Sequence, residues 1–154
     1  MKRYLKMLFL ICCIVACSFS VHAEELVDGS ALTKLSEVKS DTRTNARGVY
    51  LSYGSARLTD QGNHTVNVWG STTCYKTSDQ VKVTLYLQRL VGGNWSTVTT
   101  LSTKIAYNDY YVSNSRNVTV TGGYYYRIKG THTAIKGSTT ETTTSVTDGM
   151  WVSK

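Results

Sequence analysis

Apolar and polar side chains alternate through most of the chain beyond residue 47, and no other feature constrains the fold as strongly. In the clearest run, from Gln80 to Leu90, one set of positions carries Val81, Val83, Leu85 and Leu87, and the other carries Lys82, Thr84, Tyr86 and Gln88. A period of two places successive side chains on opposite faces of a β-strand. The run therefore predicts a strand with one buried face and one solvated face, and no segment of this region shows the 3.6-residue period of a helix.

The same alternation predicts further strands along the chain, separated by turns every eight to fifteen residues. The predicted strands cover 49–58, 64–74, 80–90, 95–102, 110–121, 124–129 and 139–146, followed by Met150-Trp151-Val152. Gly92-Gly93-Asn94 and Gly122-Gly123 predict hairpin turns, and Tyr107-Asn108-Asp109 predicts a loop. About seven short strands favour an all-β fold, a single antiparallel β-sandwich of the immunoglobulin-like class, with an open or closed barrel as the alternative. In such sandwiches a Tyr after a corner turn hydrogen-bonds back to the chain, and Tyr124 or Tyr126 is placed to do so.

The N-terminus has the layout of a secretory signal peptide over residues 1–23. Lys2, Arg3 and Lys6 form a basic start, Met7 to Ala16 form an apolar stretch, and Val21-His22-Ala23 predicts cleavage after Ala23. The apolar stretch is too short to remain as a membrane-spanning helix, so the mature chain is expected to have no transmembrane segment. We expect residues 24–47 to be a polar, disordered spacer and residues 48–154 to be the β domain.

A lipoprotein signal competes with free secretion. Ile14-Val15-Ala16-Cys17 matches the pattern in which Cys17 is lipidated and becomes the mature N-terminus. The protein is therefore expected to be secreted, with anchoring to the membrane through Cys17 as the alternative, and a Cys17→Ser change separates the two.

The charge distribution argues against nucleic acid as a partner. The formal net charge is +7, but three of the basic residues lie in the predicted signal peptide. From Glu24 onward, 14 basic residues face 10 acidic ones, and the basic residues are spread singly along the sequence. Nucleic-acid binding usually needs a dense basic stripe, which this sequence lacks.

Candidate catalytic and metal-binding groups are few. Cys74 is the only Cys after the predicted signal peptide. It falls on an apolar strand face, so we expect a buried thiol that packs in the core rather than a catalytic nucleophile. His64 and His132 are the only His in the domain, and their spacing to acidic residues makes neither a triad nor a metal site. The sequence therefore predicts no enzyme, no metal and no cofactor.

Four segments together resemble a known family. They are Arg47-Gly-Val-Tyr-Leu51, Val83-Thr-Leu-Tyr-Leu-Gln-Arg89, Asn94-Trp-Ser-Thr-Val98 and Gly123-Tyr-Tyr-Tyr-Arg-Ile-Lys-Gly-Thr-His132. The chain resembles a family of small secreted proteins of Gram-positive bacteria that has no known function, and the strand layout is similar to that of immunoglobulin-like and fibronectin-type modules. This resemblance implies export and a β-sandwich, and it transfers no site residues.

Aromatic residues are the best indication of a function. Trp69, Tyr86 and Tyr125 fall on strand faces expected to point outward, and Tyr107, Tyr110 and Tyr111 cluster at the predicted loop. Exposed aromatic rings can stack on sugars or anchor protein partners. The alternative is that they only pack against one another across the face of a sheet. We expect a secreted, non-catalytic binding module at or outside the cell envelope, with a cell-wall glycan or an envelope or host protein as the partner. A secreted antibacterial toxin is the second hypothesis, and a surface lipoprotein or an enzyme is the third.

Overall fold

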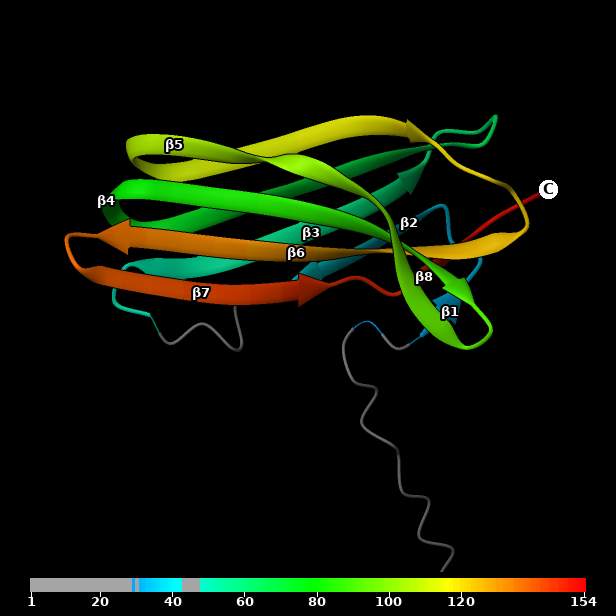
Figure 1. Ribbon diagram of the computed structural model, residues 1–154, viewed down its shortest axis with the longest axis horizontal. Coiled ribbons are helices and arrows are strands. Elements are labelled where there is room, and N and C mark those ends of the chain that lie inside the picture. Colours follow the sequence, from blue (N-terminus) through cyan, green and yellow to red (C-terminus); the bar gives the residue numbers. More distant parts are fainter. Residues whose placement is uncertain (1–28, 30, 43–47) are drawn as a thin grey trace, which may run out of the picture.

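Within Gly29, residues 31–42 and residues 48–154, which the computed structural model describes, all regular structure is β (Figure 1). The all-β prediction is thereby confirmed, while the predicted signal peptide and Cys17 lie outside the described residues. The strands are β1 (Leu32–Thr33), β2 (Glu37–Asp41), β3 (Leu51–Asp60), β4 (Thr65–Val91), β5 (Asn94–Thr119), β6 (Tyr124–Lys136), β7 (Thr139–Val146) and β8 (Gly149–Val152).

β4 and β5 are far longer than any predicted strand, because each continues through a bend. The strands predicted at 64–74 and 80–90 are two parts of β4, whose pairing with β5 shifts register between Thr73 and Ser78. The strands predicted at 95–102 and 110–121 are likewise two parts of β5. The expectation of a loop at Tyr107-Asn108-Asp109 is wrong: Asn108 turns the strand with φ 50°, a conformation that Asn tolerates, and pairing with β4 continues at both neighbours.

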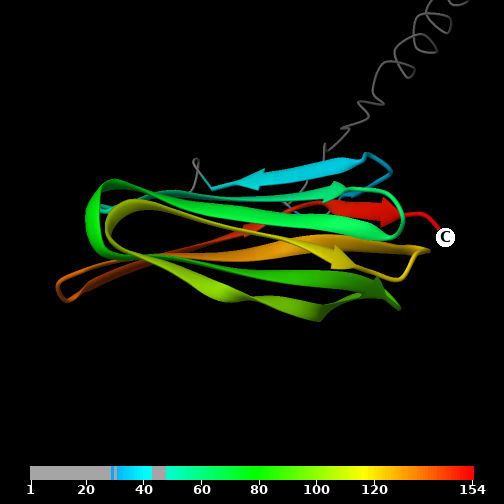
Figure 2. The ribbon, with the colours of Figure 1, turned by 90° about the horizontal axis from the view of Figure 1, so that it is seen from above.

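The strands form one sheet that curls over on itself. Its order is β1-β8-β6-β4-β3-β2, with β5 beside β4 and β7 beside β6. Because the β4–β5 hairpin folds over at its bends, the sheet makes two facing layers (Figure 2). The β3 layer contains β2, β3 and the paired segments 65–73 and 111–119. The β6 layer contains β1, β6, β7, β8 and the paired segments 78–91 and 94–109.

The two N-terminal strands correct the expectation of a disordered spacer over the described part of residues 24–47. β1 pairs in parallel with β8, in the β6 layer, and β2 pairs antiparallel with β3, in the β3 layer. Only three residues separate β1 from β2, so this segment joins the two ends of the curled sheet. Its sequence shows little alternation, and its strand conformation comes from pairing with edges that lie far along the chain.

The core lies between the two layers and follows the predicted alternation. Val81, Val83, Leu85 and Leu87 of β4 are fully buried, while the residues between them are partly exposed. Leu58, Val66 and Val68 face them from the β3 layer, and Ile128 and Met150 add to the core from the β6 layer. Burial of these side chains is the main stabilising contribution, at about 2 kcal/mol for each large aliphatic residue.

A corner hydrogen bond that the sequence predicts is present. The hydroxyl of Tyr126 donates to the carbonyl oxygen of Thr121 at 2.8 Å, across the Gly122-Gly123 turn. The Tyr126 ring is buried, so this bond satisfies the one polar atom of a large core side chain. Of the two candidates, Tyr126 is the residue that makes the bond.

The carboxylate of Glu141 ties β7 to the start of β3. It accepts hydrogen bonds from the backbone N–H groups of Val49, Tyr50 and Leu51, at 2.8, 2.9 and 2.7 Å. Burial acts to raise the pKa of Glu141, but the three hydrogen bonds favour the charged form and hold the pKa below its ordinary value. Glu141 thus closes one side of the curled sheet.

His132 of β6 is fully buried between the layers and is held by two hydroxyl groups. Its Nδ1 lies 3.0 Å from Thr72 Oγ1, and its Nε2 lies 2.8 Å from Ser145 Oγ. Thr72 Oγ1 also donates to the carbonyl oxygen of Lys82 at 2.8 Å, so Nδ1 of His132 carries the proton and donates to Thr72. A Cβ at Gly54 would lie 2.1 Å from the imidazole ring, so glycine is required there for the ring to fit.

Burial lowers the pKa of His132 from its ordinary 6.5 to about 4, and a backbone hydrogen bond to Ser71 acts in the opposite direction. The unfolded chain therefore binds a proton more readily than the folded one as the pH falls below 6.5. We expect this residue to lower the free energy of unfolding by about 2 kcal/mol between pH 7 and pH 5. Urea unfolding curves measured at both pH values check this. A His64→Gln variant, which lacks only an exposed His, should keep the loss, and a His132→Gln variant that retains the same loss would refute the assignment.

Candidate functional site

The outward side chains of the β3 layer are aligned in rows that cross the strands. Strand pairing places residues side by side, and a step of two residues along each strand gives the next row, about 7 Å away. One row contains Lys39, Arg57, Trp69 and Ser115, the next contains Asp41, Ser55, Ser71 and Ser113, and the third contains Tyr53, Thr73 and Tyr111. The middle row carries only short side chains, and each neighbouring row carries large ones.

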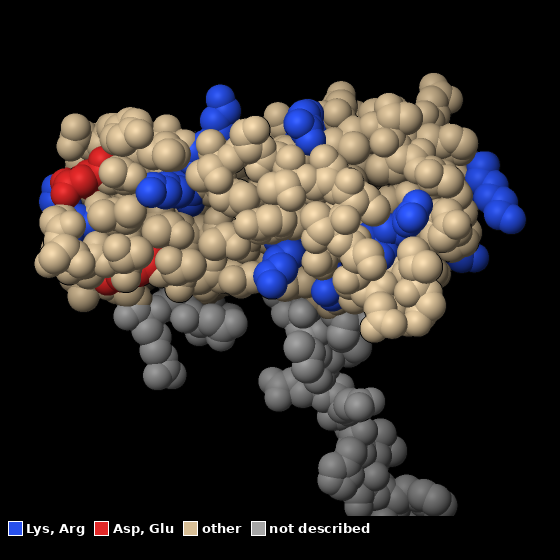
Figure 3. All heavy atoms as spheres, viewed as in Figure 1, with Lys and Arg blue, Asp and Glu red and all other residues tan. Residues whose placement is uncertain are grey.

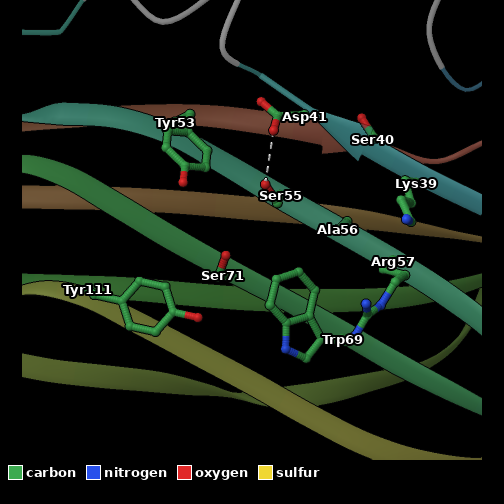
Figure 4. Close-up of a pocket in the computed structure, with 10 residues that line it drawn as sticks. All are labelled: Lys39, Ser40, Asp41, Tyr53, Ser55, Ala56, Arg57, Trp69, Ser71 and Tyr111. Atoms are coloured by element: carbon green, nitrogen blue, oxygen red, sulfur yellow. Dashed lines mark hydrogen bonds between the residues drawn. The ribbon is translucent and has the colours of Figure 1, made fainter.

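This arrangement makes a groove on the outer face (Figure 4). Its volume is about 330 Å³. Figure 4 shows Trp69 on one side of Ser71 and Tyr111 on the other, with Tyr53 beyond Ser55. The lining residues are Lys39, Ser40, Asp41, Tyr53, Ser55, Ala56, Arg57, Trp69, Ser71 and Tyr111.

Trp69 is fixed in place by a charged stack. The guanidinium carbon of Arg57 lies 4.9 Å from the centroid of the Trp69 ring, within the range of a cation–π contact. Arg57 Nε lies 3.9 Å from Glu37 Oε2, and Glu37 Oε1 lies 3.0 Å from Lys39 Nζ. Hydrogen bonds from Lys39 and Thr59 hold the pKa of Glu37 below its ordinary value, so Glu37 stays charged at neutral pH.

The opposite wall is positioned by the bend in β5. Asp109 Oδ1 accepts hydrogen bonds from the backbone N–H groups of Tyr110, at 2.6 Å, and of Tyr111, at 3.3 Å. This fixes the backbone just before Tyr111 opposes Thr73 of β4. The Tyr111 side chain stays 40% exposed, so its ring is available to a ligand.

The floor of the groove is made of hydroxyl groups. Ser55 Oγ donates to Asp41 Oδ2 at 3.4 Å, whereas the Ser71 hydroxyl has no hydrogen-bond partner among the described residues. Ser71 is buried at 4% exposure, so the partly exposed Ser55 offers the more accessible hydroxyl to polar groups of a ligand.

The charges that the described residues place around the groove are balanced. Lys39 and Arg57 contribute two positive charges, and Glu37 and Asp41 contribute two negative ones. Elsewhere, the face drawn in Figure 3 carries its Lys and Arg side chains singly rather than as a stripe. The described residues of the groove therefore combine polar and aromatic chemistry with balanced charges.

The six aromatic residues predicted from the sequence do not form one site. Trp69 and Tyr111 line the groove, while Tyr107 and Tyr110 are 65% and 59% exposed near the bend and do not line it. Tyr86 and Tyr125 lie in the β6 layer, on the other side of the molecule from the groove. Tyr125 packs edge-to-face against Trp151, with ring centroids 4.9 Å apart.

The outer face of the β6 layer uses its aromatic residues to hold its own chain together. Arg127 lies over the Trp95 ring at 4.3 Å from its centroid. The same guanidinium donates to Gln88 Oε1 at 2.9 Å and to the carbonyl oxygen of Gly29 at 3.1 Å. These contacts tie the N-terminal segment to the sheet, so this face is less suited to a ligand than the groove is.

Sequence reasoning missed most of the groove. Tyr53, Ser55 and Arg57 alternate along β3, and this pattern could have assigned them to one outward face. No pattern in the sequence indicates that Lys39 and Asp41 join them, because both lie in the segment expected to be a spacer. Their position depends on the pairing of β2 with β3.

The thiol and imidazole groups lie apart from the groove. Cys74 is buried, and burial raises the pKa of its thiol, which agrees with the expected role as a small core residue. His132 hydrogen-bonds to hydroxyls, and no cluster of three or more His, Cys, Asp or Glu side chains suited to a metal occurs in the described part of the chain. Across the same residues no helix has the length and apolar character needed to cross a membrane.

Comparison with known proteins gives a family and no characterised relative. A family model described as a family of unknown function, DUF6147, matches residues 24–150. No curated protein and no solved structure matches the chain significantly.

The burial of Cys74 makes a direct prediction about its reactivity. We expect its thiol to react with iodoacetamide at pH 7.5 roughly 100-fold more slowly in the native protein than in urea, because exposure requires opening of the core. Peptide mass spectrometry follows the alkylation of this residue over time. Equal rates in the native and unfolded proteins would show that Cys74 is accessible and contradict its placement.

Proposed function

We propose that this chain, which belongs to the DUF6147 family of unknown function, is an exported, non-catalytic binding module that holds its ligand in the groove of the β3 layer. It acts at or outside the cell envelope. The observation that carries the proposal is the groove itself, in which two aromatic walls flank a hydroxyl floor on a solvent-facing surface.

Export is supported by two independent observations. The first residues have the basic start, apolar stretch and small-residue site of a signal peptide. The family match begins at residue 24, directly after the predicted cleavage site. Free secretion and anchoring through Cys17 both place the β domain outside the membrane, so the proposal holds for either.

We infer that the domain is an immunoglobulin-like sandwich. Two layers that face each other across an apolar core support this, as does the corner bond from Tyr126 to Thr121. Packed layers of this kind are rigid, and a rigid sheet face holds the groove side chains in a fixed geometry for binding.

The test compares two double variants in a sedimentation assay with envelope fractions of the producing bacterium. In the groove variant, Trp69→Ala is combined with Tyr111→Ala. In the control variant, Tyr107→Ala is combined with Tyr110→Ala, which removes two aromatic rings that are more exposed than Tyr111 and lie outside the groove. We expect the wild type and the control to sediment with the envelope, and the groove variant to lose at least about tenfold in affinity.

Melting temperatures of all proteins establish that each variant is folded. If the folded groove variant binds as the wild type does, the groove is not the binding surface. If the wild type itself stays in solution, the proposed action at the envelope is wrong.

A further inference from the structure

From the chemistry of the groove we infer that its ligand is an uncharged linear glycan that lies across the strands of the β3 layer. The inference rests on the proposed function and adds the class of the ligand and its direction. It follows from the shape, the walls, the floor and the charge of the groove, taken in turn.

The shape suits a narrow chain. The row of Asp41, Ser55, Ser71 and Ser113 runs perpendicular to the strands, between the row of Arg57 and Trp69 and the row of Tyr53 and Tyr111. The backbone positions of the two flanking rows are four residues apart along a strand, or about 13 Å. From β2 to β5 the middle row crosses three strand spacings, or about 14 Å, which is room for a short run of sugar residues.

The walls suit sugar rings. One face of a pyranose carries mainly C–H groups, which pack against the electron-rich faces of aromatic rings. Trp69 and Tyr111 stand on opposite sides of Ser71, so a ring above this residue can contact an aromatic side chain on either side (Figure 4).

The floor distinguishes a glycan from an extended peptide. The partly exposed Ser55 hydroxyl donates to Asp41 and can still accept from a sugar hydroxyl, whereas the Ser71 side chain is only 4% exposed and mainly keeps the floor low. A bound peptide strand usually gains its affinity from main-chain hydrogen bonds to a free sheet edge. The groove lies on a sheet face, where the backbone groups of β3 and β4 are already paired with their neighbours.

The charge distinguishes a neutral glycan from an anionic polymer. Lys39 and Arg57 are balanced by Glu37 and Asp41, and three of these four are joined in one chain of ion pairs, from Lys39 to Glu37 to Arg57. These four side chains give a phosphate-rich or uronic polymer no net positive field, and such a polymer would have to compete with the acidic side chains for both cations.

Calorimetric titration of the purified protein tests the inference against defined probes. The uncharged probes are the hexasaccharides of β-1,4-glucose, β-1,4-N-acetylglucosamine, β-1,3-glucose and α-1,4-glucose, and the charged probes are polygalacturonate and heparin. We expect binding to an uncharged probe, with an affinity that changes less than about twofold between about 50 and 500 mM NaCl. Trp69→Ala and Ser71→Leu should each weaken binding about tenfold or more, and Tyr110→Ala should leave it within about twofold.

Chemical treatment of the envelope fraction decides the class of ligand even if none of these sugars is the right one. Groove-dependent sedimentation should survive protease digestion and survive hydrofluoric acid, which cleaves phosphodiester polymers. Loss after protease would identify a protein ligand, and loss after hydrofluoric acid would identify a phosphodiester-linked anionic polymer. Either result overturns the glycan inference and leaves the proposed function in place, whereas envelope binding that the groove variant retains overturns both.

Discussion

The structure depends on the folding over of the β4–β5 hairpin, because this one bent pair of strands belongs to both layers. Val66 and Val68 occupy even positions of β4 and Val83 and Leu85 occupy odd ones, yet all four are buried in the same interior. The reversal of the chain, together with the unequal number of residues at the register shift between Thr73 and Ser78, brings both sets to that interior. The exposed stretch Tyr75–Thr77 and the left-handed Asn108 provide the reversal in the two strands. Burial of apolar surface between the layers then stabilises the bend that creates them.

The groove follows from the same register. Trp69 lies beside Arg57, and Ser71 lies beside Ser55, because β3 and β4 pair in one alignment. A slip of one residue in β4 would turn Trp69 into the core and Val68 out to solvent. Burial of Val66, Val68 and Leu58 therefore fixes the outward rows of β3 and β4 as well as the inward side chains, and the geometry of the groove is specified by the same register as the core.

Local sequence patterns correctly predicted the structural features that are determined by interactions between nearby residues. The two faces of Val81 to Leu87, the turn at Gly92-Gly93 and the corner bond of Tyr126 all depend on residues close together in the chain. Three other features depend on pairing between distant segments. They are the joining of predicted strands into β4 and β5, the formation of β1 and β2, and the meeting of Trp69 with Tyr111. Local alternation cannot specify such pairing, and for this reason two of the six candidate aromatics were brought together and the other four were not.

If the outer face of the β3 layer is the binding surface, an NMR titration of the labelled protein with solubilised envelope polymer should locate the contact there. We expect the largest chemical-shift changes on the indole N–H of Trp69 and on the amides of Ser55, Ser71 and Tyr111. The resonances of Tyr125 and Trp151, on the other layer, should stay in place. Changes concentrated on Trp95, Tyr125 and Trp151, with the groove residues unmoved, would contradict this location of the binding surface.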